Sequence, residues 1–191
     1  MIVFITGGAG FIGSSLIKRL ILYKNIKIIN IDKLTYAGNI KNLEEVKLSD
    51  SYCFEKVDIC DNFLISSLLS KYKPDAIIHL AAESHVDRSI DSPSDFINTN
   101  ILGTYNLLDT TYRYWSSSPD RVKKTFKFIH VSTDEVYGEL NINEDKFNES
   151  SPYKPNSPYS ASKASSDHLV RAWGKTYQFP YIISNCSNNY G

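Results

Sequence analysis

The chain has 191 residues, with 21 basic and 21 acidic side chains and a formal net charge of zero. This length suffices for one well-buried domain, and the apolar, charged and aromatic fractions are ordinary for a globular protein. The balanced charge gives no indication of nucleic acid or an anionic membrane as a partner, and no apolar run is long enough to span a bilayer.

The three cysteines, Cys53, Cys60 and Cys186, are odd in number and lack the spacing of metal ligands. We therefore expect reduced, mostly packing cysteines in a cytoplasmic protein without a secretory signal. Because no Cys/His cluster is present, we expect no metal site. His85 and His130 are expected to make local hydrogen bonds and to pack within a strand, respectively.

The chain begins with an apolar, β-prone segment at residues 1–6, and a glycine-rich turn follows it. The turn, Gly7-Gly-Ala-Gly-Phe-Ile-Gly13, fits both G-x-x-G-x-x-G and, from Gly8, G-x-G-x-x-G, and helical spacing continues over residues 14–23. Such glycines let the backbone approach a pyrophosphate at the N-terminus of the helix. The strand–turn–helix order predicts a dinucleotide site rather than a turn without a ligand.

A second strand, residues 26–31, ends at Asp32. A carboxylate about 20 residues after the glycines accepts hydrogen bonds from an adenosine ribose and repels a 2′-phosphate, which favours NAD over NADP. Lys33 weakens this preference, and Asp32 could instead cap the following turn. Asp58 could do the same before a later helix.

The rest of the chain continues to alternate strands and helices. We expect a short helix at 39–48, a strand at 52–57, a helix at 62–72, a strand at 75–80, a long helix at 92–115, a strand at 126–132, a helix at 159–177 and a sixth strand at 180–184. This alternation predicts an α/β fold, a doubly wound parallel sheet of Rossmann type spanning residues 1–191. Ligands of such sheets bind beyond the carboxyl ends of the strands.

Two polar segments are predicted to be loops. The basic cluster at residues 121–124 is expected to be solvated. Residues 139–157, with Pro152 and Pro155 inside the segment and Pro158 directly after it, are expected to form a surface loop over the site. Residues 185–191 follow the last strand and are expected to begin a substrate-contacting loop, with most of the substrate-binding region absent.

The reactive side chains cluster after the fifth strand. Ser132-Thr-Asp-Glu-Val-Tyr-Gly138 supplies hydroxyls and two adjacent carboxylates, and Tyr159-Ser-Ala-Ser-Lys163 follows. Tyrosine, with a reference pKa of ~10, is a poor base unaided, but a lysine four residues later lies on the same helical face and can stabilise the phenolate. Two carboxylates beside such a pair suggest a site that removes both a hydride and a water. The alternatives are solvated strand-end acids and a surface Tyr-Lys pair.

These motifs resemble the extended short-chain dehydrogenase/reductases and, within that superfamily, the dTDP-glucose 4,6-dehydratases. The resemblance also rests on Asp32-Lys-Leu-Thr35, Asp58-Ile59, Leu80-Ala-Ala-Glu-Ser-His-Val-Asp-Arg-Ser89, Asn98-Thr-Asn100 and Asn185-Cys-Ser-Asn-Asn-Tyr-Gly191. The resemblance covers only the nucleotide-binding part of these enzymes. Members of the family normally continue into a second, mainly C-terminal region that holds the nucleotide-sugar.

The resemblance implies an internal redox elimination that converts dTDP-glucose to its 4-keto-6-deoxy product. Tyr159 would take the proton of the C4 hydroxyl, Lys163 would hold the phenolate and the nicotinamide ribose, and Thr133 would bond near O4. Glu135 would remove the C5 hydrogen, and Asp134 would protonate the departing C6 hydroxyl. Like charges push two neighbouring pKa values apart, which suits carboxylates with opposite roles.

The resemblance also implies contact residues. The NAD-binding set would be Gly7, Gly10, Phe11, Ile12, Gly13, Asp32, Lys33, Leu34, Thr35, Asp58, Ile59, Leu80, Ala81, Ala82, Glu83, Ser84, Thr99, Tyr159, Lys163 and Asn189. Ser84, Thr133 and Asn188 would contact substrate. Asn100 would either relay protons or bond backbone as a buried amide.

The family forms homodimers through adjacent helices, for which residues 92–115 and 159–177 are the candidates, and it supplies deoxysugars for rhamnose or other surface glycans. Two other functions remain open at this point. One is a 4-epimerase or a dehydratase of another nucleotide-sugar. The other is a non-catalytic or truncated NAD-binding half, since little in the chain could hold a sugar nucleotide.

Overall fold

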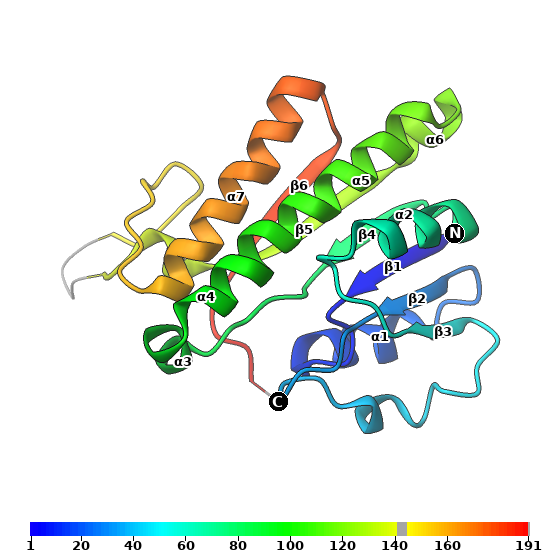
Figure 1. Ribbon diagram of the computed structural model, residues 1–191, viewed down its shortest axis with the longest axis horizontal. Coiled ribbons are helices and arrows are strands. Elements are labelled where there is room, and N and C mark those ends of the chain that lie inside the picture. Colours follow the sequence, from blue (N-terminus) through cyan, green and yellow to red (C-terminus); the bar gives the residue numbers. More distant parts are fainter. Residues whose placement is uncertain (141–144, 191) are drawn as a thin grey trace.

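The strands of the computed structural model, which describes residues 1–140 and 145–190, form one parallel sheet (Figure 1). The strands are β1 (Ile2–Thr6), β2 (Lys27–Ile31), β3 (Tyr52–Glu55), β4 (Ala76–His79), β5 (Lys127–Thr133) and β6 (Tyr181–Cys186). Their order is β3-β2-β1-β4-β5-β6, which confirms the predicted doubly wound sheet. The chain reverses direction across the sheet between β1 and β4, where such folds form a ligand crevice.

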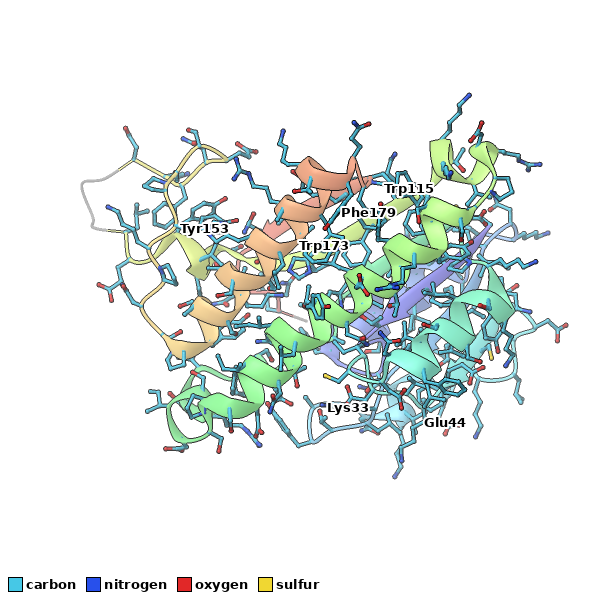
Figure 2. All side chains as sticks on the ribbon, turned by 45° about the horizontal axis from the view of Figure 1, so that its top comes forward. Lys33, Glu44, Trp115, Tyr153, Trp173 and Phe179 are labelled. Carbon is cyan, nitrogen blue, oxygen red and sulfur yellow. The ribbon has the colours of Figure 1, made fainter. Side chains whose placement is uncertain are left out.

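One face of the sheet is covered by α2 (Asn62–Tyr72), α5 (Thr104–Ser117) and α7 (Pro158–Tyr177). Phe4, Ile77 and Phe128 from three strands are buried under these helices. Figure 2 shows Trp115 of α5 beside Phe179, and their ring centroids lie 5.6 Å apart in an edge-to-face arrangement. This core fixes α5 and α7 on the sheet.

The opposite face is covered mainly by α1 (Phe11–Leu20) and the 3₁₀ turn η1 (Ile40–Leu43). Val3 and Ile5 alternate with Phe4 along β1 and point to this second face, where Ile17 of α1 packs against them. The alternation is the period-2 pattern of a strand that is buried on both sides.

The predicted long helix at 92–115 is interrupted. It consists of α4 (Pro93–Phe96), a π-helical segment η2 (Ile97–Gly103) and α5. Asn100, in the π segment, is held by the backbone of Glu83, and a Cβ on Gly103 would lie 2.7 Å from Ile59 Cδ1. These contacts come from elsewhere in the chain, so apolar spacing gave no sign of the wider turn, which is a feature common at functional sites.

Several other boundaries differ from the predictions. Helix α1 begins at Phe11, directly after Gly10, and includes Gly13, because Ser14 N already bonds Gly10 O. The expected helix at 39–48 is only the turn η1, and the expected solvated loop at 121–124 lies in a short helix, α6 (Asp120–Thr125). Helix α3 (Val86–Asp91) and the 3₁₀ turn η3 (Asp134–Tyr137) were not predicted.

The predicted loop at 139–157 has no helix or strand over residues 145–157, whereas residues 141–144 lie outside the described part of the chain. Residues 145–157 nevertheless pack against the turn η3. The Tyr137 ring lies 5.2 Å from those of Phe147 and Tyr153, and Lys154 N bonds Val136 O. Among the helices described, none has both the length and the apolar character needed to cross a membrane.

Candidate active site

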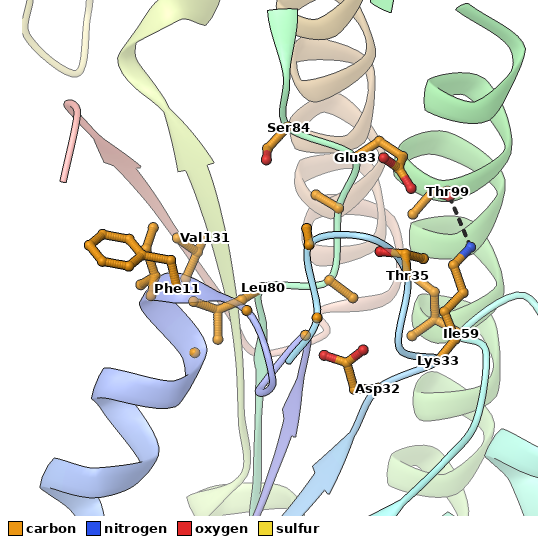
Figure 3. A pocket seen from close by; sticks show the side chains of 18 of the residues that line it. Phe11, Asp32, Lys33, Thr35, Ile59, Leu80, Glu83, Ser84, Thr99 and Val131 are labelled. Atoms are coloured by element: carbon orange, nitrogen blue, oxygen red, sulfur yellow. Dashed lines mark hydrogen bonds between the residues drawn. The ribbon is translucent and has the colours of Figure 1, made fainter. Parts of the chain in front are cut away.

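A cavity of about 490 Å³ opens at the carboxyl ends of the strands, where β1 and β4 diverge (Figure 3). Most of the residues assigned above to the cofactor line it: Gly7, Gly10, Phe11, Ile12, Gly13, Asp32, Lys33, Thr35, Asp58, Ile59, Leu80, Ala81, Ala82, Glu83, Ser84, Thr99, Tyr159 and Lys163. Leu34 is not among the lining residues, and its backbone N donates a hydrogen bond to Asp32 Oδ1. Asn188 and Asn189 are exposed and also lie outside the cavity lining.

The glycine turn forms the floor of the cavity and brings α1 toward it. Gly7 has φ +72°, and a Cβ there would lie 2.6 Å from Ala81 N, so only glycine fits this approach. Gly10 precedes α1 and no side chain caps that helix. The first amide groups of α1, together with the helix dipole, therefore suit a pyrophosphate at this end of the cavity.

Asp32 ends β2 with each carboxylate oxygen in a backbone hydrogen bond. Ala9 N donates to Oδ2 at 2.9 Å, and Leu34 N donates to Oδ1 at 2.8 Å. The turn-capping interpretation is therefore correct, and the residue also lines the cavity. The bond to Ala9 N links the acidic residue to the glycine turn, so one carboxylate both shapes the turn and faces the ligand space.

The Lys33 ammonium at the cavity is paired with two neighbouring side chains. Its Nζ lies 3.3 Å from Asp58 Oδ2 and bonds Thr99 Oγ1 at 3.4 Å, as the dashed line in Figure 3 indicates. Burial opposes ionisation of Asp58, but the hydrogen bond from Cys60 N and the Lys33 charge outweigh it and lower the pKa of Asp58. A paired Lys33 is a weaker partner for a 2′-phosphate.

Tyr36 is a cavity residue that the sequence patterns did not single out. The Arg88 guanidinium lies 3.7 Å from the centroid of its ring, and the His85 ring lies 5.9 Å away. Burial and then the nearby Glu83 raise the pKa of the Tyr36 phenol. No spacing signal connects Tyr36 with Arg88, since the two meet only in the tertiary structure. The other cavity residues missed are Ile31, Ala37, Gly38, Val57, His85, Val131 and Ser132.

Tyr159 and Lys163 lie in the first turns of α7, at the far end of the cavity from Asp32. The helix starts with a reciprocal Ser157–Ser160 capping box and Pro158, which fixes where both side chains project. Both residues are buried, and Lys163 Nζ donates to Val131 O at 2.8 Å. Burial lowers the pKa of Lys163 to about 8 and raises the pKa of Tyr159 to about 12. Tyr159 is thus a phenol at pH 7 in this chain, and stabilisation of its anion by Lys163 stays a prediction.

The two carboxylates follow directly at the end of β5. Thr133 is buried, and its Oγ1 accepts a hydrogen bond from Glu135 N at 3.2 Å, which begins the turn η3. Burial and then Asp134 raise the pKa of Glu135. Negative charge on Glu135 and, less strongly, on Asp134 also raises the pKa of Tyr159, while the Thr133 hydroxyl lowers it. The structure therefore brings Thr133, both acids and Tyr159 together.

Two other predicted residues have structural partners. His130 is fully buried in β5, as expected of a strand-packing residue. Asn100 is a buried amide: its Nδ2 donates to Glu83 O and Ser162 Oγ, and its Oδ1 accepts from Glu83 N. These hydrogen bonds agree with the buried-amide alternative for Asn100, which needs no proton relay. A buried acid that the sequence patterns missed, Asp167, lies two helical turns after Tyr159 on α7.

The chain has extensive similarity to known proteins. A protein-family model described as GDP-mannose 4,6 dehydratase matches residues 4–191. The chain is 57% identical over 191 residues to a dTDP-glucose 4,6-dehydratase of Haemophilus influenzae, and 56% identical over 189 residues to one of Neisseria meningitidis serogroup B. The matches cover 100% and 99% of this chain but 56% and 53% of those relatives, so the chain spans about half the length of the curated relatives it matches.

Solved structures are similar over the same portion. The dTDP-glucose 4,6-dehydratase DesIV of Streptomyces venezuelae, crystallised with NAD and TYD, superposes with a TM-score of 0.90 at 43% identity. A UDP-glucose 4-epimerase of Thermotoga maritima, crystallised with UDP-glucose, gives 0.85 at 30%. Both alignments cover 100% of this chain and 57% of the other. The backbone is thus shared with epimerases, and the identity is higher with the dehydratases.

Proposed function

The chain belongs to the GDP-mannose 4,6 dehydratase family and is homologous to the N-terminal portion of dTDP-glucose 4,6-dehydratases, and we propose that it is the NAD-binding, catalytic part of such a dehydratase acting on dTDP-glucose. The observation that carries the proposal is that Tyr159 and Lys163 line the cavity, while Asp134 and Glu135, which are not among its lining residues, lie close enough to Tyr159 for their charges to raise its pKa. A 4-epimerase needs the tyrosine and lysine but neither acid.

The cavity fits a dinucleotide chemically. The uncapped N-terminus of α1 suits the pyrophosphate, and Asp32 suits the adenosine ribose. Bound NAD⁺ would supply the hydride acceptor and, later, the hydride donor. Asp32 together with the paired Lys33 favours NAD over NADP.

The residues of the chain would then divide the proton transfers. Tyr159 accepts the proton of the C4 hydroxyl, and the Lys163 ammonium lowers the cost of the resulting phenolate. The 4-ketone acidifies the C5 hydrogen, which Glu135 removes. Burial raises the pKa of Glu135 toward the pH at which a general base is most effective. Asp134 protonates the departing C6 hydroxyl, a role that rests on the resemblance to the dehydratases.

On its own, the chain is proposed to bind NAD with weak or absent turnover, because a nucleotide-sugar needs binding groups beyond this cavity. We propose a homodimer through α5 and η2, supported by the exposed apolar side chains of Ile97, Leu102 and Tyr105. Placement in the cytoplasm and a role in deoxysugar supply are proposals that follow from the same relatives.

The test has two arms. Calorimetry of the purified chain should detect NAD⁺ binding tighter than NADP⁺ binding. The chain is then joined to the C-terminal portion of the Haemophilus influenzae relative and incubated with NAD⁺ and dTDP-glucose, with products identified by NMR. Formation of dTDP-4-keto-6-deoxyglucose supports the proposal.

The complete relative serves as the positive control, and a joined protein with Glu135→Gln serves as the negative control. A C4-epimerised sugar would point to the epimerase alternative. Failure to bind NAD⁺, or no product from a folded joined protein when the relative is active, would refute the proposal.

A further inference from the structure

Asp167 is a buried carboxylate placed in line with the two reactive residues of α7. Tyr159, Lys163 and Asp167 follow one another at four-residue spacing and therefore lie along one face of the helix. Their exposed fractions fall from 9% to 5% to 1% along this line. Asp167 thus lies at the buried end of a row that begins at the cavity.

The Asp167 carboxylate connects α7 with three other segments. Its Oδ2 accepts hydrogen bonds from Ser132 Oγ in β5 at 2.8 Å, from Tyr153 Oη at 2.9 Å and, at 3.4 Å, from Asn185 Nδ2 in β6. Figure 2 shows Tyr153 on the segment that leads into α7. Asn185 Nδ2 also donates to Thr133 O at 3.2 Å. The carboxylate is therefore linked to both strand ends that border the acid pair.

We infer that Asp167 is a positioning residue of the proposed site, whose buried charge one helical turn from Lys163 keeps that lysine protonated and whose hydrogen bonds align α7 with the Thr133–Glu135 segment. The inference rests on the proposed function only for its effect on catalysis. The contacts themselves belong to the folded chain and can be tested without cofactor or substrate.

The charges around this group make the role specific. Burial opposes ionisation of Asp167, but His130, through both a hydrogen bond and its charge, then the Lys163 charge and the Ser132 hydroxyl outweigh it and lower the pKa of Asp167. His130 Nε2 lies 3.1 Å from Asp167 Oδ1, and burial lowers the pKa of His130 to about 4, so this imidazole is neutral at pH 7. With His130 neutral at pH 7, Lys163 is the remaining cation whose charge acts on Asp167.

The other titratable groups around the pair are uncharged at pH 7. They are His79 of β4, buried and with a strongly lowered pKa, and the Tyr137, Tyr153 and Tyr159 phenols, whose pKa values are raised. The Cys186 thiol of β6 also faces Lys163. Burial lowers the pKa of Lys163, and Asp167 is the largest influence in the opposite direction. Without Asp167, the lysine would lose its proton near neutral pH.

The experiment measures the pKa of Lys163 by NMR of chain labelled with ¹³Cε-lysine, with Lys163→Met identifying the signal. Asp167→Asn removes the charge while keeping the shape of the side chain. We expect the pKa of Lys163 to fall by about one unit or more. Asp109→Asn is the matched control, since Asp109 pairs with Arg113 on the exposed side of α5, and it should leave the pKa of Lys163 unchanged. Tyr153→Phe removes one hydrogen bond but no charge and should have a much smaller effect than Asp167→Asn.

An unchanged pKa of Lys163 in folded Asp167→Asn protein would overturn the inference. If that variant does not fold, the carboxyl ¹³C signal of Asp167 in the unsubstituted chain decides. An ionised Asp167 from pH 5 to pH 8 is expected, and a protonated Asp167 at pH 7 would overturn the inference.

In the joined protein, the activity of Asp167→Asn should be reduced at pH 7 and recover in part toward lower pH, where Lys163 regains its proton. Asp167→Glu should restore part of the activity at pH 7. If the unsubstituted joined protein is inactive but the pKa of Lys163 still falls in Asp167→Asn, the proposed function is refuted and the influence of Asp167 on Lys163 stands.

Discussion

Replacing Gly7 by alanine should destabilise the fold because the glycine turn leaves no room for a side chain. Gly7 has φ +72°, and an added Cβ would lie 2.6 Å from Ala81 N and 2.8 Å from Leu80 C. Left-handed backbone costs an alanine about 1–2 kcal/mol, and displacing packed atoms costs about 1–3 kcal/mol. The smaller entropy of the unfolded alanine chain offsets about 0.4–1 kcal/mol. We expect a net loss of about 2–4 kcal/mol.

Gly10→Ala provides the matched comparison within the same turn. Gly10 has φ −74°, and the nearest atom to an added Cβ is Gly7 O at 3.3 Å. Its substitution should change the free energy of unfolding by less than about 1 kcal/mol. Urea unfolding of both variants, followed by far-UV circular dichroism with the slope m compared to that of the unsubstituted chain, measures the two values.

The expected loss for Gly7→Ala is a large share of a typical domain stability of about 5–15 kcal/mol. The variant should also bind NAD⁺ more weakly, because the displaced turn no longer presents the N-terminus of α1. If Gly7→Ala is no less stable than Gly10→Ala, Gly7 does not approach Ala81 closely in solution, and the glycine turn does not form the floor of the cavity.

Three further outcomes follow from the site. In the joined protein, Glu135→Gln should block elimination while leaving C4 oxidation partly intact, and continued exchange of the C5 hydrogen with solvent would exclude Glu135 as the base. Tyr159→Phe should abolish the first hydride transfer, so rapid reduction of bound NAD⁺ would contradict its assignment. Burial lowers the pKa of His130 from 6.5 to about 4, so between these two pH values His130 is protonated in the unfolded chain but not in the folded chain. Acidification through this range should therefore lower the free energy of unfolding by about 2–3 kcal/mol. Urea unfolding at pH 7 and pH 4.5 measures this loss of stability.

The parallel α/β sheet and many of the cavity-lining residues could be anticipated because their signals are local. Gly7, Gly10 and Gly13 are separated by fixed intervals, and Asp32 directly ends an apolar strand. Parallel strands bring their carboxyl ends to one edge of the sheet, so residues at those ends share a cavity whatever the details of packing. The Tyr159–Lys163 spacing similarly fixes a shared helical face.

Helix boundaries were less predictable because packing overrides local preference. Residues 97–103 were predicted as part of one continuous helix, yet the bonds from Asn100 to Glu83 and Ser162 accompany a π-helical turn. Those partners lie 17 and 62 residues away along the chain. Apolar periodicity reports only which face is buried, not which distant group a polar side chain will meet.

The sequence by itself therefore determined the α/β fold, the glycine turn, the acidic residue after β2 and which tyrosine, lysine and acids are the candidates for catalysis. Only the tertiary structure decided how these groups are charged and supported. Lys33 meets Asp58, Tyr36 meets Arg88, and Asp167 gathers Ser132, Tyr153 and Asn185 beneath Lys163. Burial and charge pairing depend on distances between segments far apart in the chain, and those distances exist only once the sheet has assembled.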